Sequence, residues 1–507
     1  MTAASNRKLG DSLPVILLIF LGLILRVYNF WRPPLWIDEY GTWWVVAADT
    51  WFEVIERTLK IQGQTPLYYL LVTAITKLAG IGTWQLRLLS IVFGTAMLGV
   101  IYPLAIKIFN HRSVALLSLA IFSLSEPLIW YSQIARPYAL ALFLSLVSFW
   151  AFVSLHETES KWQRILYVIS TALTIYAHYV FGLIVIIQAS YMMARRGYNR
   201  TILFNWIATI LATALLLTPA IQNFSYLHSR RHTLDWVAAL DSSSKVAYGI
   251  IYLLGGLSPI VVLATISAVG LVCFKRIEWP GAEIRQRLTL PLLWYTIPLI
   301  LALLLPILLG VSLLQTRYLL FAYPAVYFLL ARLMLSVTAN RYHQWLPAAV
   351  FVISTSITVL LPALHTSRTF SRWPSQAWNN ALTDKTLLDH FDGMVVAQIG
   401  FVEANQLVDN HKDPWLFSFL SWPLVATAPT LSAQNIAILP YRLTDRTQRY
   451  FDSLLEKAVK HSRICLVGDG DVLSQFEEQL LRDSNYSVTT RTDHGGNFKT
   501  LILERSR

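Results

Sequence analysis

Apolar residues gather into runs of about 20 along much of this chain, separated by short polar or basic segments. A helix of about 20 apolar residues is long enough to cross the roughly 30 Å hydrocarbon core of a bilayer. We therefore predict a polytopic all-α membrane protein with about eleven spanning helices. The predicted spans are approximately residues 13–30, 88–106, 114–130, 138–155, 164–177, 180–194, 202–222, 246–274, 289–311, 318–337 and 345–364.

A further, weaker apolar stretch at 66–81 decides the topology, because each additional crossing inverts every later loop. Its shortness, its opening Pro66 and its interrupting Lys77 favour a helix in the membrane interface. With that assignment the basic loop clusters all share one side, which the positive-inside rule makes cytoplasmic. The outer face then holds residues 31–87, 131–137, the region of His178, 223–245, 312–317 and the chain after about 365.

The chain after residue 365 has a different pattern. Short strands are predicted at 394–399, 435–439, 464–467 and 500–503, with helical patterns at 448–461 and 473–482. We expect a small extracytoplasmic α/β domain over 366–507. It follows a membrane domain over 1–365, in which residues 31–87 form the first outer loop.

Composition supports a membrane protein, since 55% of the residues are hydrophobic and 14% are charged. Soluble domains are roughly 45–50% apolar and about 25% charged. The net charge of +12 comes from small clusters between apolar runs, so it indicates topology and not nucleic-acid binding. Arg7 and Lys8 precede the first run, which lacks an Ala-x-Ala cleavage site and is predicted to be an uncleaved span. Cys273 and Cys465 lie in unlike surroundings, so no disulfide is expected.

Two adjacent acids, Asp38 and Glu39, stand in the first outer loop among aromatic residues. A carboxylate near an apolar boundary is suited to accept a proton as a general base. The alternative is structural, because acids are also favoured in the first turn of a short interfacial helix. The pair by itself leaves both interpretations open.

Three further polar residues belong to other outer segments: Arg136, His178 and Arg317. A guanidinium can bind a phosphate through its planar fork, although an arginine at a span end also commonly extends to the lipid headgroups. A lone histidine is more often a packed residue than a ligand. The convergence of an acid, two arginines, a histidine and tyrosines on one face indicates a site for a phosphorylated lipid donor and an acceptor hydroxyl.

The ordered motifs resemble those of the GT-C glycosyltransferases. The similarity is greatest to the bacterial enzymes related to protein O-mannosyltransferases and to the lipid A aminoarabinose transferase, which use polyprenyl-phosphate sugars. The matching segments are, in order, Leu25-Arg26, Leu35-Trp36-Ile37-Asp38-Glu39, Pro66-Leu67-Tyr68-Tyr69-Leu70-Leu71, Leu86-Arg87-Leu88-Leu89-Ser90, Tyr131-Ser132-Gln133, Ala135-Arg136-Pro137-Tyr138-Ala139-Leu140, Ala177-His178-Tyr179 and Arg317-Tyr318-Leu319-Leu320.

The resemblance implies a GT-C-like fold with interfacial helices in the first outer loop. It implies that the Asp38-Glu39 pair is catalytic, with Asp38 as the general base or as the acid that orients the acceptor. It implies that Arg136 and Arg317 bind the donor phosphate. It further implies inverting transfer from a polyprenyl-phosphate sugar to an envelope glycan, lipid or protein acceptor, at the outer face of a bacterial plasma membrane. The residues expected to line the donor site are Gln64, Tyr68, Tyr69, Tyr131, Tyr138 and His178.

Two positions depart from the family pattern. Gln64 and Thr65 precede Pro66 where a histidine and a proline are usual, and Ile134 replaces a common glutamate. Glu126 can replace that acid only if its helix end folds back toward the loop. Asp38, Glu39 and Glu126 are hard oxygen ligands of the kind that divalent metals take, but no further pattern supports a metal site.

Other functional classes share some of these features. A transporter or flippase also has many spans with buried charge, and a subunit that only binds lipid carriers would retain the phosphate-binding residues. Transporters often show two related halves and charges near mid-membrane. Here no internal repeat is evident and the polar residues cluster at span ends on one side. This pattern favours chemistry at the membrane surface.

Overall fold

The computed structural model describes residues 2–28, 30–31, 35–155, 160–194, 200–216, 218, 249, 251, 254–258, 265, 282–309, 315–335, 341–365, 391–410, 413–428, 430–483, 485–495 and 498–505. The chain forms two compact units. The helical unit comprises Met1–Phe30 and Gly63–Phe370, and the α/β unit comprises Trp31–Gln62 and Ser371–Arg507. The first part of the predicted outer loop therefore groups with the C-terminal residues and not with the membrane helices.

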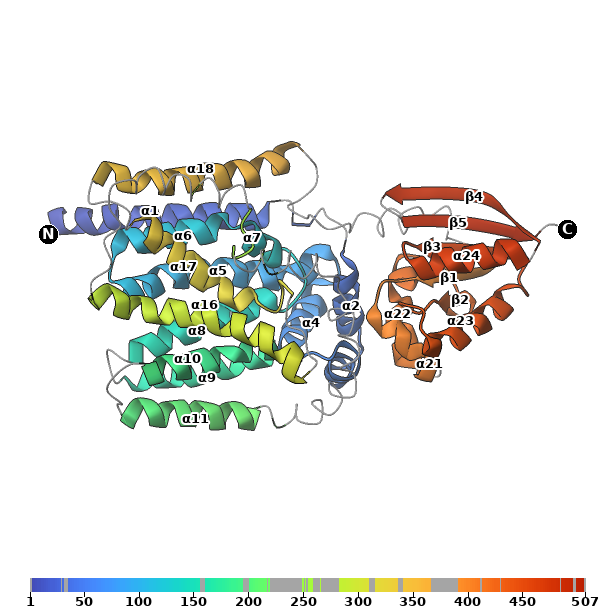
Figure 1. The fold of residues 1–507 in the computed structure, drawn as a ribbon, viewed down its shortest axis with the longest axis horizontal. Helices are drawn as coiled ribbons and strands as arrows, with labels where there is room; N and C mark the ends of the chain where they lie inside the picture. Colours follow the sequence, from blue (N-terminus) through green and yellow to red (C-terminus); the bar gives the residue numbers. More distant parts are fainter. Residues whose placement is uncertain are drawn as a thin grey trace. The chain divides into compact units, whose positions relative to one another are not determined.

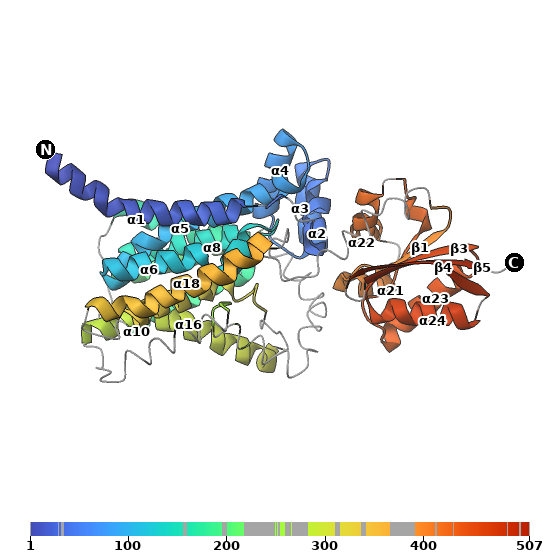
Figure 2. The same ribbon diagram turned by 90° about the horizontal axis from the view of Figure 1, so that it is seen from above.

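The helical unit is a bundle of helices that lie side by side (Figures 1 and 2). Helix α5 is central to it and contacts α1, α4, α6, α7, α8 and α16. Among the described residues its elements are α1 (Thr2–Val27), α4 (Leu67–Ala79), α5 (Thr83–Phe109), α6 (Arg112–Leu124), α7 (Glu126–Ser132), α8 (Tyr138–Leu155), α9 (Lys161–Ala177), η2 (Tyr179–Leu183), α10 (Ile184–Ala194), α11 (Arg200–Leu216), α16 (Ala282–Leu309), η4 (Leu320–Ala322), α17 (Tyr323–Met334) and α18 (Arg341–His365).

Most predicted spans coincide with one of these helices, but the predicted number of spans is not confirmed. By length and hydropathy, three helices in the described part are able to cross a membrane alone: Thr83–Phe109, Tyr138–Leu155 and Arg285–Leu305. A fourth span results if α6 and α7, which are bent by 57° at Ser125, count as one. The predicted span at 246–274 lies largely outside the described residues, and the predicted outer segment at 223–245 lies entirely outside them.

The weak apolar stretch after Pro66 forms α4, a helix of 13 residues. At 1.5 Å per residue such a helix extends only about 20 Å, less than the hydrocarbon thickness. Its exposed end includes Leu78, which is 90% exposed. The length of α4 is therefore consistent with a helix that lies along the membrane.

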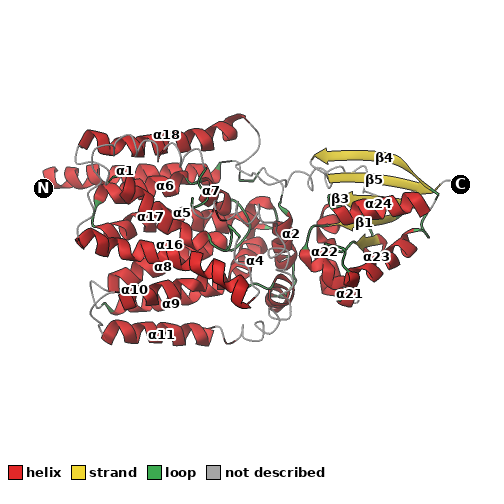
Figure 3. Ribbon diagram, in the orientation of Figure 1, coloured by secondary structure: helices red, strands yellow, loops and turns green. Residues whose placement is uncertain are grey.

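The α/β unit begins with three short helices from the first outer loop, α2 (Ile37–Val46), α3 (Trp51–Arg57) and the π-helix η1 (Thr58–Gln62). Its sheet has the order β2-β1-β3-β5-β4, with β1 parallel to β2 and β3, and with β5 antiparallel to β3 and β4. Figure 3 shows these strands in yellow among the helices of the unit. The C-terminal elements in the described part are β1 (Met394–Gln398), η5 (Val402–Gln406), α21 (Leu407–Asn410), α22 (Pro414–Thr427), η6 (Ala433–Asn435), β2 (Ile436–Ile438), α23 (Asp445–Ala458), β3 (Arg463–Gly468), α24 (Asp471–Asp483), β4 (Tyr486–Gly495) and β5 (Phe498–Arg505).

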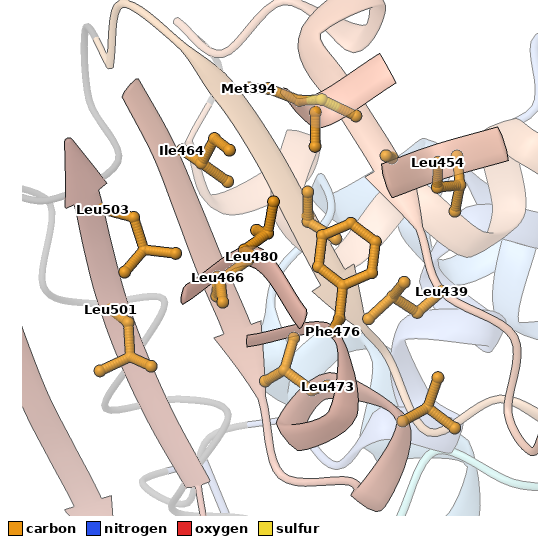
Figure 4. Close-up of a cluster of buried hydrophobic side chains, with 14 of the residues drawn as sticks. Met394, Leu439, Leu454, Ile464, Leu466, Leu473, Phe476, Leu480, Leu501 and Leu503 are labelled. Atoms are coloured by element: carbon orange, nitrogen blue, oxygen red, sulfur yellow. The ribbon is translucent and has the colours of Figure 1, made fainter. Parts of the chain in front are cut away.

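The core of this unit lies between the sheet and helices α23 and α24 (Figure 4). Phe451 and Leu454 of α23 and Phe476 of α24 pack with Leu466 of β3 and Leu501 of β5. The small C-terminal α/β fold is confirmed, because the four predicted strands coincide with β1, β2, β3 and β5 and the two helical patterns with α23 and α24. Strand β4 and helix α22 were not predicted.

Candidate active site

The third predicted span, at 114–130, is a broken helix, and the loop that follows it carries Arg136. Helix α6 ends at Leu124, and α7 starts at Glu126 after a bend of 57°. The break leaves the last carbonyls of α6 without helical partners. The buried Arg26 guanidinium donates to the carbonyl oxygens of Phe122, at 3.1 Å, and Ser123, at 3.4 Å. The Leu25-Arg26 motif thus has a structural role, which is to stabilise this broken helix.

The loop after α7 carries Arg136 and is fixed at both of its ends. The Gln133 side-chain amide donates to the carbonyl oxygens of Leu25, Arg26 and Tyr28 at 3.1–3.2 Å, which satisfies the C-terminal end of α1. The Arg136 carbonyl accepts a hydrogen bond of 3.3 Å from the Ser90 hydroxyl. Gln133 therefore supports the site and does not line it.

Tyr68 joins helix α4 to the same loop. Its hydroxyl lies 2.9 Å from the hydroxyl of Ser90, which in turn bonds the Arg136 carbonyl. The Tyr68 and Tyr69 rings meet edge to face with centroids 5.6 Å apart, and both side chains are fully buried. The Leu-Tyr-Tyr and Leu-Arg-Leu-Leu-Ser motifs, far apart from Arg136 in sequence, thus hold the backbone of Arg136 in place.

A set of aromatic rings surrounds His178, which occupies the short break between α9 and η2. The imidazole centroid lies 5.4 Å from the ring of Tyr138 and 6.2 Å from that of Tyr318. Tyr138 continues to Tyr131 at 5.2 Å, and the Tyr131 hydroxyl lies 3.2 Å from the hydroxyl of Thr316. Three predicted site segments, at 131–138, at His178 and at 315–318, are therefore brought together.

His178 is held as a neutral imidazole. Burial, and after it the positive charges of Arg136 and Arg317, lower the pKa of His178 to about 3. A neutral imidazole has one N–H donor and one acceptor nitrogen. His178 is completely buried, and neither ring nitrogen has a hydrogen-bond partner among the described residues. A buried polar group without a partner costs about 1–3 kcal/mol, so most such groups in folded proteins have one.

Two further segments contain buried polar atoms without partners in the described part of the chain. One is the side-chain nitrogen of Gln315, in the turn that carries Arg317 and Tyr318. The others are Oε1 of Gln64 and the hydroxyl of Thr65, just before α4. Gln64 stands where the family pattern has a histidine, so a polar group is retained at that position. Gln315 was not predicted as a site residue, although it lies two residues before Arg317.

The two acids of the first outer loop have different surroundings. Glu39 is completely buried, and its carboxylate accepts a hydrogen bond of 2.8 Å from the backbone N–H of Trp36 at the start of α2. This is the helix-capping role that the sequence left open. Asp38 lies in the same first turn and is half-buried.

The position of the family's second acid is filled by an apolar side chain. Ile134 is buried with 5% exposure, and its carbonyl accepts from the N–H of Arg136 at 2.8 Å. Glu126 stands at the opposite end of α7 from Ser132, about 9 Å along the helix axis, so the helix does not fold back to bring it to the loop. Within the described ranges, no group of three or more His, Cys, Asp or Glu side chains is placed to hold a metal ion.

Comparison with known proteins supports the resemblance inferred from the motifs. Residues 63–222, which include Tyr68, Arg136 and His178, match the family model described as dolichyl-phosphate-mannose-protein mannosyltransferase. A search of curated proteins finds no match.

The fold is similar to those of two solved glycosyltransferases. The crystal structure of apo ArnT from Cupriavidus metallidurans aligns with a TM-score of 0.55 and 12% identity, over 96% of this chain and 97% of ArnT. The cryo-EM structure of an arabinofuranosyltransferase AftD mutant from Mycobacteria aligns with a TM-score of 0.50 and 14% identity, over 97% of this chain and 41% of AftD. At these identities the likeness establishes the fold. The predicted GT-C resemblance is confirmed by the family match and by this shared fold.

Proposed function

We propose that this chain is a membrane glycosyltransferase that takes a sugar from a polyprenyl-phosphate carrier and transfers it to an acceptor outside the cytoplasm. The observation that carries the proposal is the group of Arg136, His178 and Arg317, in which His178 is completely buried and both of its ring nitrogens lack partners among the described residues. The family whose model matches residues 63–222 is named for a sugar carried on dolichyl phosphate, which is itself a polyprenyl phosphate.

The two arginines suit the phosphate of such a donor. A guanidinium offers planar, charge-assisted hydrogen bonds to phosphate oxygens, and these strengthen as negative charge develops on the leaving group. The neutral His178 suits a different part of the donor. Its N–H can donate to an oxygen of the phosphate or sugar. Its acceptor nitrogen needs an O–H, which a sugar hydroxyl provides and the ionised phosphodiester of the donor does not.

Asp38 is the proposed general base. The acceptor hydroxyl gives its proton to the Asp38 carboxylate, and the acceptor oxygen forms a bond to the anomeric carbon as the bond from that carbon to the phosphate oxygen breaks. Direct displacement inverts the anomeric configuration and releases the polyprenyl phosphate, whose charge Arg136 and Arg317 stabilise. Glu39 is assigned a structural role, because its carboxylate caps α2.

The proposed location is a bacterial plasma membrane, with the site and the C-terminal residues outside the cytoplasm. Two observations support this orientation. Helix α4 is short, and if it does not cross the membrane, all the basic loop clusters lie on the same, cytoplasmic side. The polar groups around His178 lie at helix ends and in loops. This arrangement favours chemistry at the surface over a transport pathway through mid-membrane.

The test is sugar transfer by the full chain in proteoliposomes supplied with a panel of undecaprenyl-phosphate sugars. Asp38→Asn should lower the rate by about 10²–10⁴-fold, the usual contribution of a general base. Asp49→Asn is the matched control, because Asp49 is an exposed acid in the same segment, and its rate should remain within about twofold of wild type. Undiminished turnover by Asp38→Asn would refute the assignment of the base. Mass analysis of envelope glycans, glycolipids and glycoproteins after gene deletion would identify the sugar and its acceptor.

A further inference from the structure

Helix α22 of the C-terminal residues packs directly on α2, the helix whose first turn carries Asp38. The central contact is Trp44, which is completely buried. Its indole N–H donates to the Ser418 hydroxyl at 3.1 Å, and its ring meets that of Phe419 edge to face with centroids 5.4 Å apart. Both partners belong to α22, so a helix more than 370 residues away in sequence holds the first-loop helix.

Further contacts surround this one. Trp43 meets Trp422 of α22 edge to face with centroids 6.1 Å apart. The guanidinium of Arg57 lies 4.6 Å from the centroid of the Trp44 ring and donates to the Trp44 carbonyl at 2.5 Å. The Lys60 ammonium of η1 lies 5.3 Å from the centroid of Trp415, also in α22. The first-loop helices and α22 are therefore joined by aromatic and cationic contacts along two turns.

These contacts define which way α2 faces. Successive residues of an α-helix are rotated by about 100°, which places Trp43 and Trp44 each about 120–140° around the axis from Asp38. The two tryptophans therefore occupy one face of α2, and Asp38 projects from the opposite face. Since α2 is a single helix of 10 residues, a turn about its axis or a shift on α22 displaces Asp38 directly.

We propose that α22 is a positioning element for Asp38, and that the C-terminal residues serve transfer by fixing the orientation of α2 through Trp44 and Ser418. This proposal rests on the proposed function in one respect, which is the role of Asp38 as the base. Trp44 and Ser418 are positioning residues, because they act through the helix and touch neither donor nor acceptor in the proposal.

Ser418 offers a sharp test because α22 contains a second serine that serves as its control. Ser418→Ala removes the acceptor for the Trp44 indole, whereas the Ser421 hydroxyl donates to the Phe417 carbonyl of its own helix at 2.8 Å and makes no bond to α2. Ser421→Ala therefore changes the same chemical group in the same helix without loosening α2. Trp44→Phe retains an aromatic ring but lacks the indole N–H, and it should behave like Ser418→Ala.

Two readouts are measured on the full chain in proteoliposomes: hydrogen exchange of residues 37–46, and the kinetics of transfer from undecaprenyl-phosphate sugars. Ser418→Ala and Trp44→Phe should each raise exchange in 37–46 by about fivefold, the loss of one net hydrogen bond. Each should lower kcat by about tenfold with little change in the KM for the donor, because a base displaced by less than 1 Å slows chemistry. The double variant should have the same exchange rate and kcat as the less active single variant, because both substitutions remove the same hydrogen bond. Ser421→Ala should match wild type in both readouts.

The outcomes separate the two proposals. Equal exchange and equal kcat in Ser418→Ala and Ser421→Ala would overturn the positioning role. A raised exchange with unchanged kcat would show that α22 holds α2 but that Asp38 does not need this support, which also overturns it. A raised exchange in a chain whose wild type transfers none of the sugars would count against the glycosyltransferase proposal, while the physical link from α22 to α2 would stand.

Discussion

The helical unit and the α/β unit differ in how many of their buried polar side-chain atoms have hydrogen-bond partners among the described residues. In the α/β unit, Gln398 accepts from the Leu473 N–H at 2.8 Å and donates to the Tyr441 carbonyl at 3.3 Å. In the described part of that unit, only the Trp422 indole N–H is buried without a partner. In the helical unit, by contrast, His178 and Gln315 keep buried nitrogens without described partners. Within the described residues, buried polar atoms without partners are therefore more numerous in the helical unit, and those of His178 and Gln315 lie where a ligand is proposed to bind.

Gln398 shows why the sheet itself is not the proposed site. It ends β1, beside the point where β1 has β2 on one side and β3 on the other. The crevice at such a switch point is where open α/β sheets bind ligands. Here a Cβ atom added to Gly470 would collide with the Gln398 side chain, so Gln398 fills this part of the crevice. The α/β unit carries Asp38, and the helical unit carries the buried polar groups around His178.

The largest expected effect tests the ligand site of the helical unit. Arg136→Gln should weaken binding of undecaprenyl phosphate by about 30-fold to 1,000-fold, because a buried charged partner of the phosphate is lost. Native mass spectrometry or a thermal-shift titration measures this affinity. Arg287→Gln is the control, since the Arg287 guanidinium is bound instead to the exposed Glu283 at 2.9 Å. Equal affinities of the two variants would remove Arg136 from the donor site.

A smaller effect concerns the neutral histidine. Because the pKa of His178 is lowered from 6.5 to about 3 on folding, the unfolded state binds more protons between these pH values. Stability should therefore be constant above about pH 6.5 and fall as the pH drops below it, by up to about 2 kcal/mol at pH 5.

His178→Gln should remove this part of the acid sensitivity, as measured by thermal unfolding between pH 7.5 and pH 5. His494→Gln is the control, because the His494 ring bonds the Thr500 hydroxyl in the α/β unit at 2.9 Å and should leave the pH dependence of wild type in place. An unchanged pH dependence in His178→Gln would show that the buried imidazole does not stay neutral.

The smallest effect tests the assignment of a structural role to Glu39. Glu39→Ala removes the acceptor of the Trp36 N–H and should destabilise α2 by about 1 kcal/mol, the usual cost of losing a helix cap. The control is Glu56→Ala, whose exposed pair with Lys60 at 2.6 Å is worth at most about 0.5 kcal/mol. Hydrogen exchange of residues 37–46 measures the difference. A stable Glu39→Ala variant with no transfer activity would instead give Glu39 a part in the chemistry.

The local pattern of apolar and polar residues was sufficient to predict many helices and strands of both units. Apolar runs predicted the long helices, and apolar strands such as 394–399 and 464–467 became the buried β1 and β3. The pattern failed for β4, where Ser487, Thr489 and Arg491 belong to a mostly polar strand at the edge of the sheet. It also failed for α22, because its apolar residues pack in part on helices of the first outer loop. An element that depends on a distant partner carries little periodic signal of its own.

The sequence alone therefore determined the membrane character of the chain, the small C-terminal α/β fold and the family motifs, because apolar runs and motif spacing are local properties. Only the tertiary structure decided which groups several motif residues contact. Arg26 and Gln133 satisfy helix ends, Glu39 caps α2, and His178 is left buried without a described partner. Such roles depend on which carbonyls and rings lie within a few ångströms, and those neighbours come from segments far apart in the chain.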